Sequence, residues 1–256
     1  MNKLDELFCR KKKNILNIYC TAGYPAINSL QTILPALQQQ GADIIEVGIP
    51  YSDPIADGPV IQQSNMQALQ NGMTIPLLLQ QLNSLKNSIH IPIILMGYLN
   101  PVLQYGIEKF CKDAKKAGVS GIILPDLPMY EYEQWYQPYF AKNNLHPIFL
   151  ISPQTSMQRI KYADKLSSGF VYAVSSSSTT GSNKIDTGQQ QYFKKLKSLK
   201  LKNPLLIGFG IKDKVTFQNA CKYTAGAIIG SAFIKAIENS KNIQSTTAQF
   251  IKSVKQ

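Results

Sequence analysis

Residues 44–62 read IIEVGIPYSDPIADGPVIQ. The stretch combines a short apolar strand, a loop rich in proline and glycine, and the start of a helix, which together make one unit of a β/α protein. Glu46 lies inside the strand, while Asp53 and Asp57 lie in the loop. An acid in an apolar run is costly to bury unless something useful binds it, and the prolines give the loop a defined shape.

The two acids Glu46 and Asp57 therefore occupy different environments at the carboxyl end of one strand. Such a pair suits proton transfer, in which one group gives a proton and another takes it. A structural interpretation is also open at this point, with Glu46 as a buried acid that has hydrogen-bond partners. In that interpretation, Asp57 caps a helix that begins before Val60.

On both sides of this stretch, short apolar runs recur, and each is followed by a turn signal and a segment with helical periodicity. Eight runs that alternate with helices predict an α/β protein with a parallel sheet. Eight is also the number of strands that closes into a (β/α)8 TIM barrel. The runs cover residues 15–21, 43–48, 91–96, 121–124, 147–151, 170–175, 205–208 and 226–230.

The barrel is predicted to be a single domain over residues 1–256, because no linker, repeat or low-complexity tract divides the chain. Residues 4–13 predict an N-terminal helix that plugs the barrel bottom. Extra helices are expected after the second strand, over residues 60–70, and after the eighth strand. An open doubly wound sheet is the alternative, but the sequence from Thr21 to Pro25 after the first strand is a poor dinucleotide fingerprint.

Composition and charge disfavour several classes of protein. The net charge is +12, but the 27 basic residues are scattered and include only two arginines, Arg10 and Arg159. Nucleic-acid recognition favours arginine, so the charge predicts solvated helix faces instead. The four cysteines lack metal-ligand spacing, which predicts free thiols and no metal site. No apolar run approaches the ~20 residues that span a bilayer, which predicts a soluble intracellular protein.

Two glycine-containing strand ends predict a phosphate site. Barrel enzymes often bind phosphate with the loops after strands seven and eight. Here the seventh run ends in Gly208-Phe-Gly-Ile211, and the eighth ends in Gly230-Ser-Ala232 at the start of a helix. Glycine allows close approach of the backbone to an anion, and a helix N-terminus presents free N–H groups.

The sequence resembles the tryptophan synthase α subunit family along nearly its whole length. The resemblance is carried by residues 46–62, Thr21–Pro25, Asn100–Pro101, Leu124–Pro128 and the two glycine-containing strand ends. It implies a TIM barrel that cleaves indole-3-glycerol phosphate to indole and glyceraldehyde 3-phosphate, a lyase reaction of tryptophan biosynthesis. It also implies that Glu46 is the general acid/base and that Asp57 interacts with the indole N–H.

The resemblance assigns further residues to the substrate. Tyr172 is expected near the glycerol phosphate portion, and Thr180 belongs to the end of a lid over the substrate. The expected phosphate-binding residues are Gly181, Phe209, Gly210, Gly230 and Ser231. The expected apolar slot for the indole is lined by Tyr19, Met96, Ile123, Leu124, Leu150, Phe209 and Ile228.

The loop after the sixth strand departs from the family pattern. The family usually has Ser-x-x-Gly-Val-Thr-Gly there, whereas this chain has a serine-rich sequence over residues 175–181. Ser178 replaces the first glycine of the pattern, and Ser176 stands where arginine is common. Because a non-glycine residue resists positive φ, closure of the lid over residues 176–184 and its coupling to a partner are expected to differ from the family pattern.

The resemblance implies a partner and a cofactor outside this chain. The family forms an α2β2 heterotetramer with a β subunit that holds pyridoxal phosphate and takes up the indole, and the α chain has no cofactor or metal. The loop Tyr51–Pro59 and the segment Asn100–Tyr105 are the expected contact surfaces. The expected location is the cytoplasm of a bacterium, or the plastid stroma for a chain encoded in an organelle.

Three other functions stay open on the sequence alone. A non-catalytic subunit that only activates its partner is disfavoured, because Glu46, Asp57 and Tyr172 are all present. A stand-alone indole-3-glycerol phosphate lyase would use the same site residues. A different phosphosugar isomerase or epimerase would often use a lysine, a histidine or a metal at a strand end, and none is evident in the sequence.

Overall fold

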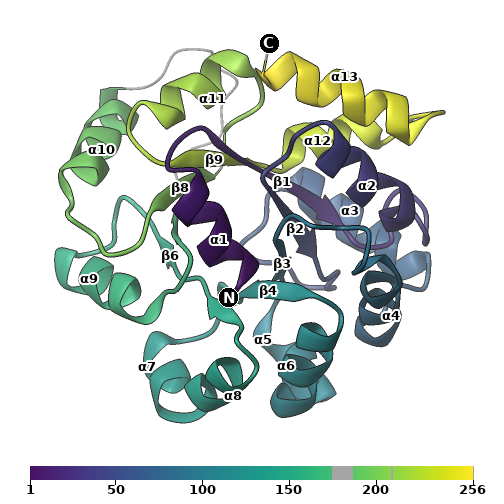
Figure 1. Ribbon diagram of the computed structural model, residues 1–256, viewed down its shortest axis with the longest axis horizontal. Helices are drawn as coiled ribbons and strands as arrows, with labels where there is room; N and C mark the ends of the chain where they lie inside the picture. The colour runs from purple at the N-terminus through teal and green to yellow at the C-terminus, as the bar shows by residue number, and fades with distance from the viewer. Residues whose placement is uncertain (175–186, 209, 256) are drawn as a thin grey trace.

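The computed structural model describes residues 1–174, 187–208 and 210–255. These residues form one sheet of nine parallel strands, and the helices lie in a ring around it (Figure 1). Neighbours in the sheet follow the order β5-β4-β3-β2-β1-β9-β8-β7-β6. The strands are β1 (Ile15–Thr21), β2 (Ile44–Gly48), β3 (Ile93–Met96), β4 (Val119–Ile123), β5 (His146–Pro147), β6 (Leu150–Ile151), β7 (Val171–Val174), β8 (Leu205–Gly208) and β9 (Gly226–Ile229).

The fifth predicted strand, over residues 147–151, is interrupted, which is why nine strands stand where eight were predicted. Pro147 has no N–H to donate, and this weakens the ladder at that point. β5 pairs with β4, and β6 pairs with β7. Between the two halves, the Ile148 N–H donates to the Ile122 carbonyl at 3.1 Å, and the Phe149 carbonyl accepts from the Tyr172 N–H at 3.0 Å. One continuous segment thus joins the two ends of the sheet, and the predicted TIM barrel is confirmed.

Strands and helices alternate along the chain, as the periodicity of the sequence predicted. The helices are α1 (Lys3–Arg10), α2 (Leu30–Gln39), α3 (Pro59–Gln70), α4 (Ile75–Leu85), α5 (Leu99–Tyr105), α6 (Ile107–Lys116), α7 (Met129–Glu131), the π-helix η1 (Tyr132–Tyr136), α8 (Gln137–Lys142), α9 (Met157–Leu166), α10 (Thr187–Ser198), α11 (Lys214–Cys221), α12 (Ser231–Ile237) and α13 (Ile243–Lys255). The predicted extra helices are α3 after β2 and α13 after β9, whereas α5 was not predicted. Within the described residues, no helix is both long and apolar enough to cross a membrane.

Helix α1 covers the amino-terminal end of the barrel, as predicted, although it ends at Arg10 rather than at residue 13. Figure 1 shows it lying across the ring of strands. Its residues Leu4, Leu7 and Phe8 are buried. The Phe8 ring packs against the ring of Phe170, with centroids 6.2 Å apart, so the helix closes the barrel bottom with apolar side chains.

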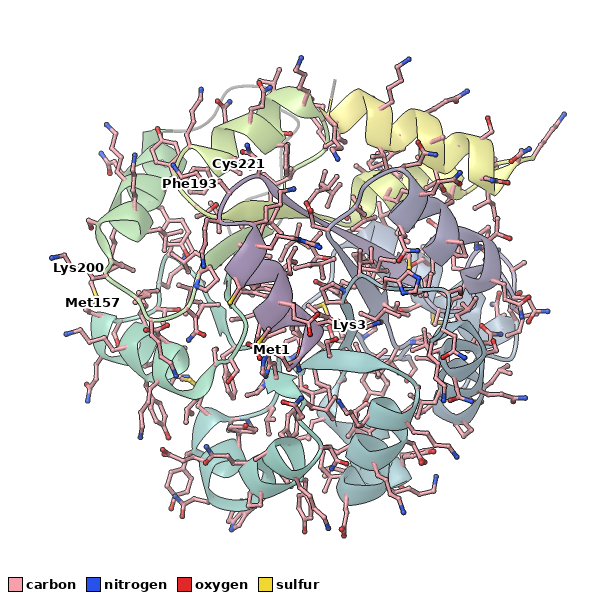
Figure 2. The ribbon with its side chains drawn as sticks, viewed as in Figure 1. Met1, Lys3, Met157, Phe193, Lys200 and Cys221 are labelled. Atoms are coloured by element: carbon pink, nitrogen blue, oxygen red, sulfur yellow. The ribbon has the colours of Figure 1, made fainter. Side chains whose placement is uncertain are left out.

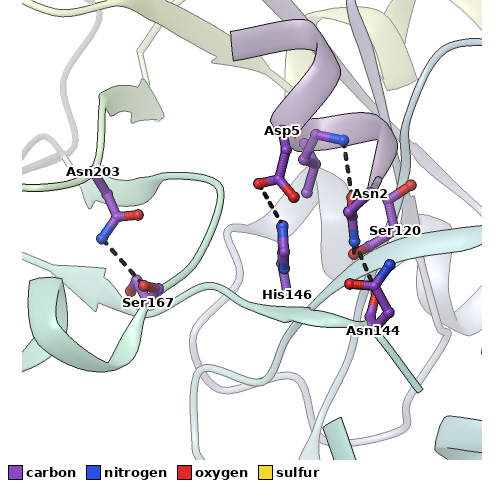
Figure 3. Close-up of polar contacts among 8 residues, drawn as sticks. Asn2, Asp5, Ser120, Asn144, His146, Ser167 and Asn203 are labelled. Atoms are coloured by element: carbon purple, nitrogen blue, oxygen red, sulfur yellow. Dashed lines mark hydrogen bonds and ion pairs between the residues drawn. The ribbon is translucent and has the colours of Figure 1, made fainter. Parts of the chain in front are cut away.

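Polar contacts fix α1 to the middle of the chain (Figure 3). Asn2 caps the helix and donates from Nδ2 to the carbonyls of Ser120 and Asn144, both at 2.8 Å. Asp5 lies 2.8 Å from Nε2 of His146. Because these partners lie in β4 and beside β5, the first residues of the chain are tied to residues more than a hundred positions away.

The basic residues are spread over the outer helices and the segments between them. Figure 2 shows nitrogen-tipped side chains extending outward around the whole rim of the molecule, Lys200 among them. This distribution agrees with the prediction of solvated helix faces. The four cysteines are free thiols, of which only Cys9 is exposed.

Candidate active site

A cavity of about 530 Å³ opens at the carboxyl ends of the strands, at the opposite end of the barrel from α1. Parallel strands bring their carboxyl ends to the same edge, so residues far apart in the sequence meet there. The lining residues are Tyr19, Glu46, Ala56, Asp57, Gly58, Pro59, Ile61, Met96, Tyr172, Gly210, Ile211, Lys212, Ile228, Gly230, Ser231, Ala232 and Lys235.

Glu46 lies on β2, in register with Tyr19 of β1, and is 1% exposed. Its Oε2 accepts a hydrogen bond from Nδ2 of Asn17 at 2.8 Å. Burial raises the pKa of Glu46 to about 8; the bond from Asn17 opposes this rise, and the charge of Asp57 adds to it. A carboxyl group with such a pKa can both give and take a proton near neutral pH.

Asp57 lies in the loop between β2 and α3, where Tyr98 holds it. The Tyr98 hydroxyl donates to Oδ2 of Asp57 at 3.0 Å and accepts from the Ala56 N–H at 3.0 Å. Burial raises the pKa of Asp57 to about 6, and the bond from Tyr98 partly opposes the rise. Gly58 occupies the N-cap position of α3, so the interpretation of Asp57 as a helix cap is wrong.

Two tyrosines of the cavity extend over the strand next to their own. Tyr19 of β1 lies over Gly48 at the end of β2, and Tyr172 of β7 lies over Gly208 at the end of β8. A Cβ atom at either glycine would overlap the tyrosine hydroxyl, so the tyrosine fits only because its partner is glycine. Burial raises the pKa of both phenols well above its ordinary value, so both can serve as hydrogen-bond donors.

The far wall of the cavity is built from backbone and lysines. Gly210 follows β8 with φ of +72°, a conformation that favours glycine. Gly230 and Ser231 connect β9 to α12, and Lys212 and Lys235 complete the wall. Backbone N–H groups and ammonium groups both attract anions. We call this wall the anchor side, and we call the wall with Glu46 and Asp57 the acid side.

The structure brings most of the predicted site residues to one cavity. Those that line it are Glu46, Asp57, Tyr19, Met96, Tyr172, Ile228, Gly210, Gly230 and Ser231. In the described part of the chain, the lining does not include Ile123, Leu124 or Leu150. Met96 and Tyr172, which were also predicted and are the register partners of Ile123 and Leu150, do line it. Thr180, Gly181, Phe209 and the lid over residues 176–184 lie outside the described residues.

Four residues with polar side chains at this site were not predicted: Asn17, Tyr98, Lys212 and Lys235. Lys235 follows Ser231 by four positions in α12, a spacing that puts both on one helix face and could have revealed it. Tyr98 follows β3 by two positions, at the same end of the barrel as the acids. Asn17 stands out only as a polar residue within the apolar strand β1.

Comparison with known sequences gives close relatives. The sequence profile of the family described as tryptophan synthase alpha chain matches residues 6–256. The tryptophan synthase alpha chain of Flavobacterium psychrophilum is 48% identical over 255 residues, covering 99% of this chain and 100% of that protein. The tryptophan synthase alpha chain of Christiangramia forsetii is 48% identical over 256 residues, covering 100% of this chain and 99% of that protein.

Solved structures share the fold along the whole chain. A crystal structure of the tryptophan synthase alpha chain from Legionella pneumophila is 32% identical with a TM-score of 0.89, covering 100% of this chain and 97% of that one. A chain of tryptophan synthase from M. tuberculosis in the aminoacrylate-bound form is 29% identical with a TM-score of 0.85, covering 99% of this chain and 100% of that one. With these relatives, a matching profile and the same barrel, the chain belongs to the tryptophan synthase alpha chain family.

Proposed function

We propose that this protein, as the α subunit of tryptophan synthase, cleaves indole-3-glycerol phosphate to indole and glyceraldehyde 3-phosphate, with separate roles for Glu46 and Asp57. The observation that carries the proposal is the pair of unequal acids in one cavity. Burial raises the pKa of Glu46 to about 8 and that of Asp57 to about 6. Near pH 7, Glu46 is therefore mostly protonated and Asp57 mostly ionised, which divides the work between a proton donor and a fixed charge.

The proton steps follow from this division. Glu46 gives its proton to C3 of the indole ring, and the ring becomes a cation with its charge on the nitrogen. The Asp57 carboxylate accepts a hydrogen bond from the ring N–H and stabilises that charge. The ionised Glu46 then takes the proton of the hydroxyl on the adjoining glycerol carbon. The carbon–carbon bond breaks, its electron pair neutralises the ring, and the glycerol carbon becomes an aldehyde, so Glu46 ends in its starting form.

The anchor side holds the phosphate in this proposal. Gly210 and Gly230 allow the backbone to approach an anion, Ser231 offers a hydroxyl, and Lys212 and Lys235 supply positive charge. Binding energy from the phosphate is remote from the reacting bond and can position the indole against the acids. The apolar lining between the two sides is Ile61, Met96 and Ile228.

We also propose an α2β2 assembly, in which a β subunit holds pyridoxal phosphate and consumes the indole. Both expected contact segments carry exposed apolar side chains: Ile55, in the loop Tyr51–Pro59, is 86% exposed, and Leu103, in Asn100–Tyr105, is 43% exposed. Exposed apolar groups of this kind suit a protein interface. The relatives named above come from bacteria, which supports the bacterial cytoplasm over the plastid stroma as the location.

Release of indole from indole-3-glycerol phosphate by the purified chain, with and without a tryptophan synthase β subunit, tests the proposal. Glu46→Gln keeps the size of the side chain but removes the proton carrier, so kcat should fall about 1000-fold with little change in KM. Glu108→Gln is the control, because Glu108 is an exposed acid on α6, and it should keep full activity. Near-normal turnover by Glu46→Gln would contradict the role of Glu46.

The same assay separates the other two functions. Turnover that the β subunit does not change would indicate a stand-alone lyase. No indole under either condition, with stimulation of the β reaction by both the unsubstituted chain and Glu46→Gln, would indicate an activating subunit without catalysis.

A further inference from the structure

One buried contact of the site has no part in the proton steps above. Asn17 of β1 is 0% exposed, and its Nδ2 donates to Oε2 of Glu46 at 2.8 Å. Among the residues that the structure describes, its Oδ1 has no hydrogen-bond partner. An amide oxygen buried without a partner is unfavourable, and the bond from Nδ2 to Glu46 offsets part of that cost in this orientation.

The direction of this bond decides where Glu46 can carry a proton. An amide nitrogen of Asn17 donates hydrogen bonds and does not accept them. The carbonyl oxygen of a neutral acid accepts a hydrogen bond more strongly than its hydroxyl oxygen, so this bond favours the form in which Oε2 is unprotonated and the proton sits on Oε1. With the amide reversed, Oδ1 would face Oε2 and would hold the proton on that oxygen instead.

We propose that Asn17 is a positioning residue: its amide N–H, donated to Oε2, confines the transferable proton of Glu46 to Oε1. The inference rests on the proposed role of Glu46 as the proton carrier. Because Glu46 lines the cavity, a proton confined to one oxygen leaves from and returns to the same atom in both transfer steps. A proton held between Oε2 and Asn17 would be withheld from the substrate.

Asn17 lowers the pKa of Glu46, whereas the other groups around Glu46 either raise that pKa or carry no charge near neutral pH. The titratable groups that face it are Asp57 from the loop after β2, Tyr19 and Cys20 from β1, and Tyr172 from β7. Burial raises the pKa of the two phenols and of the thiol, so these three are uncharged near neutral pH. Asp57 raises the pKa of Glu46. Among the described residues, Asn17 is the side chain whose hydrogen bond favours the ionised form of Glu46.

The pH dependence of kcat/KM for indole release tests the proposal. Asn17→Leu is close in size and removes the donor, so the alkaline limb, where free Glu46 loses its proton, should move up by about one pH unit. Because the proton is then no longer confined to Oε1, kcat should fall about tenfold while KM changes less than about twofold. Asn17→Asp should move the limb further upward, because an ionised carboxylate would share the proton of Glu46.

A matched control separates positioning from packing. Asn65 of α3 is 3% exposed, and within the described residues its Oδ1 also has no hydrogen-bond partner. Asn65→Leu should lower the stability of the protein without moving the alkaline limb. If Asn17→Leu likewise loses stability and leaves the limb in place, the role of Asn17 is only structural and the proposal is overturned.

Glu46→Gln distinguishes failure of this inference from failure of the proposed function. Near-normal turnover by Glu46→Gln would show that Glu46 is not the proton carrier, and the proposed catalytic role of Glu46 would fail together with this inference. An inactive Glu46→Gln, combined with an unmoved limb in Asn17→Leu, rejects the role of Asn17 alone.

A measurement on the unsubstituted chain covers the case in which the Asn17 variants fold poorly. The side-chain NH2 signals of Asn17, followed by proton–nitrogen NMR, should shift with a midpoint close to the titration of Glu46 at about pH 8. The same shift should be absent in Glu46→Gln. Signals of Asn17 that stay constant through that pH range would overturn the proposal.

Discussion

The acid side and the anchor side of the cavity differ in how they depend on the protein around them. The acid side uses burial: Glu46 is 1% exposed, and both its pKa and that of Asp57 are raised by loss of solvent. The anchor side uses the backbone at Gly210 and Gly230 and the exposed ammonium group of Lys235. A proton carrier needs a tuned pKa, whereas an anion site needs only donors and charge. We therefore expect changes on the acid side to act on kcat and changes on the anchor side to act on KM.

After Glu46→Gln, the largest effect is expected for Asp57→Asn. The substitution keeps the shape of the side chain but removes the negative charge that stabilises the indole cation in the proposed mechanism. A fall in kcat of about 100- to 1000-fold is expected, with KM changed by less than about threefold. Steady-state kinetics of indole release measures both constants. A rise in KM with normal kcat would place Asp57 in binding and break the distinction between the two sides.

The acid side should also make the stability of the protein depend on pH. The pKa of both acids is raised on folding, so the folded chain binds protons more tightly than the unfolded chain. Stability is then highest below about pH 4 with respect to these two groups, and it falls as pH rises through 6 for Asp57 and through 8 for Glu46. The loss due to Glu46 is on the order of 5 kcal/mol by pH 9.

Thermal unfolding between pH 5 and pH 9 measures this dependence. In Glu46→Gln the decline in Tm between pH 6 and pH 8 should largely disappear, because the titrating group is gone. A Tm profile of Glu46→Gln that runs parallel to that of the unsubstituted chain would show that Glu46 is not destabilised by its burial.

A smaller effect is expected for the two glycines beneath the tyrosines. Gly48→Ala and Gly208→Ala each place a Cβ atom on a tyrosine hydroxyl, so each should lower the free energy of unfolding by about 1–3 kcal/mol. Gly58→Ala is the control, since a Cβ atom there meets nothing within 4 Å. Urea unfolding of the three variants compares the costs. Equal stability of all three would mean that the tyrosines move aside freely.

The smallest effect is expected on the anchor side. Lys235→Gln removes one of several proposed phosphate contacts, so KM should rise about tenfold with kcat nearly unchanged. Lys252→Gln on α13 is a control with an exposed lysine outside the cavity lining. Kinetics at several salt concentrations should show the difference shrinking as salt rises, because ionic interactions are screened. A fall in kcat comparable to that of Asp57→Asn would mean that the anchor side takes part in the chemistry.

Most of the fold could be predicted from the sequence, because the signals are local. Apolar runs and helical periodicity mark strands and helices one at a time, and eight predicted strands indicate a closed barrel. The break between β5 and β6 could not be predicted in the same way, because it depends on which neighbour each half pairs with. Pro147 was a hint, since proline lacks the N–H that a central strand would donate.

The site residues that belong to one sequence motif could be predicted, whereas those that act only through contacts in the folded chain could not. Glu46 and Asp57 lie in one continuous stretch, so their position at a strand end was visible in the sequence. Asn17 in β1 and Tyr98 after β3 act through hydrogen bonds to these acids, and such contacts form only when β1, β2 and β3 lie side by side in the sheet. The raised pKa values have the same origin, because burial is a property of the assembled barrel and not of any short segment.

The polar contacts between α1 and the middle of the chain have a consequence for synthesis on the ribosome. Asn2 and Asp5 need Ser120, Asn144 and His146 as partners, so the first helix cannot take its final place until more than half of the chain has emerged. At ordinary translation speeds that delay is roughly ten to thirty seconds. During this time Leu4, Leu7 and Phe8 of α1 have no barrel to pack against, and their apolar side chains stay exposed.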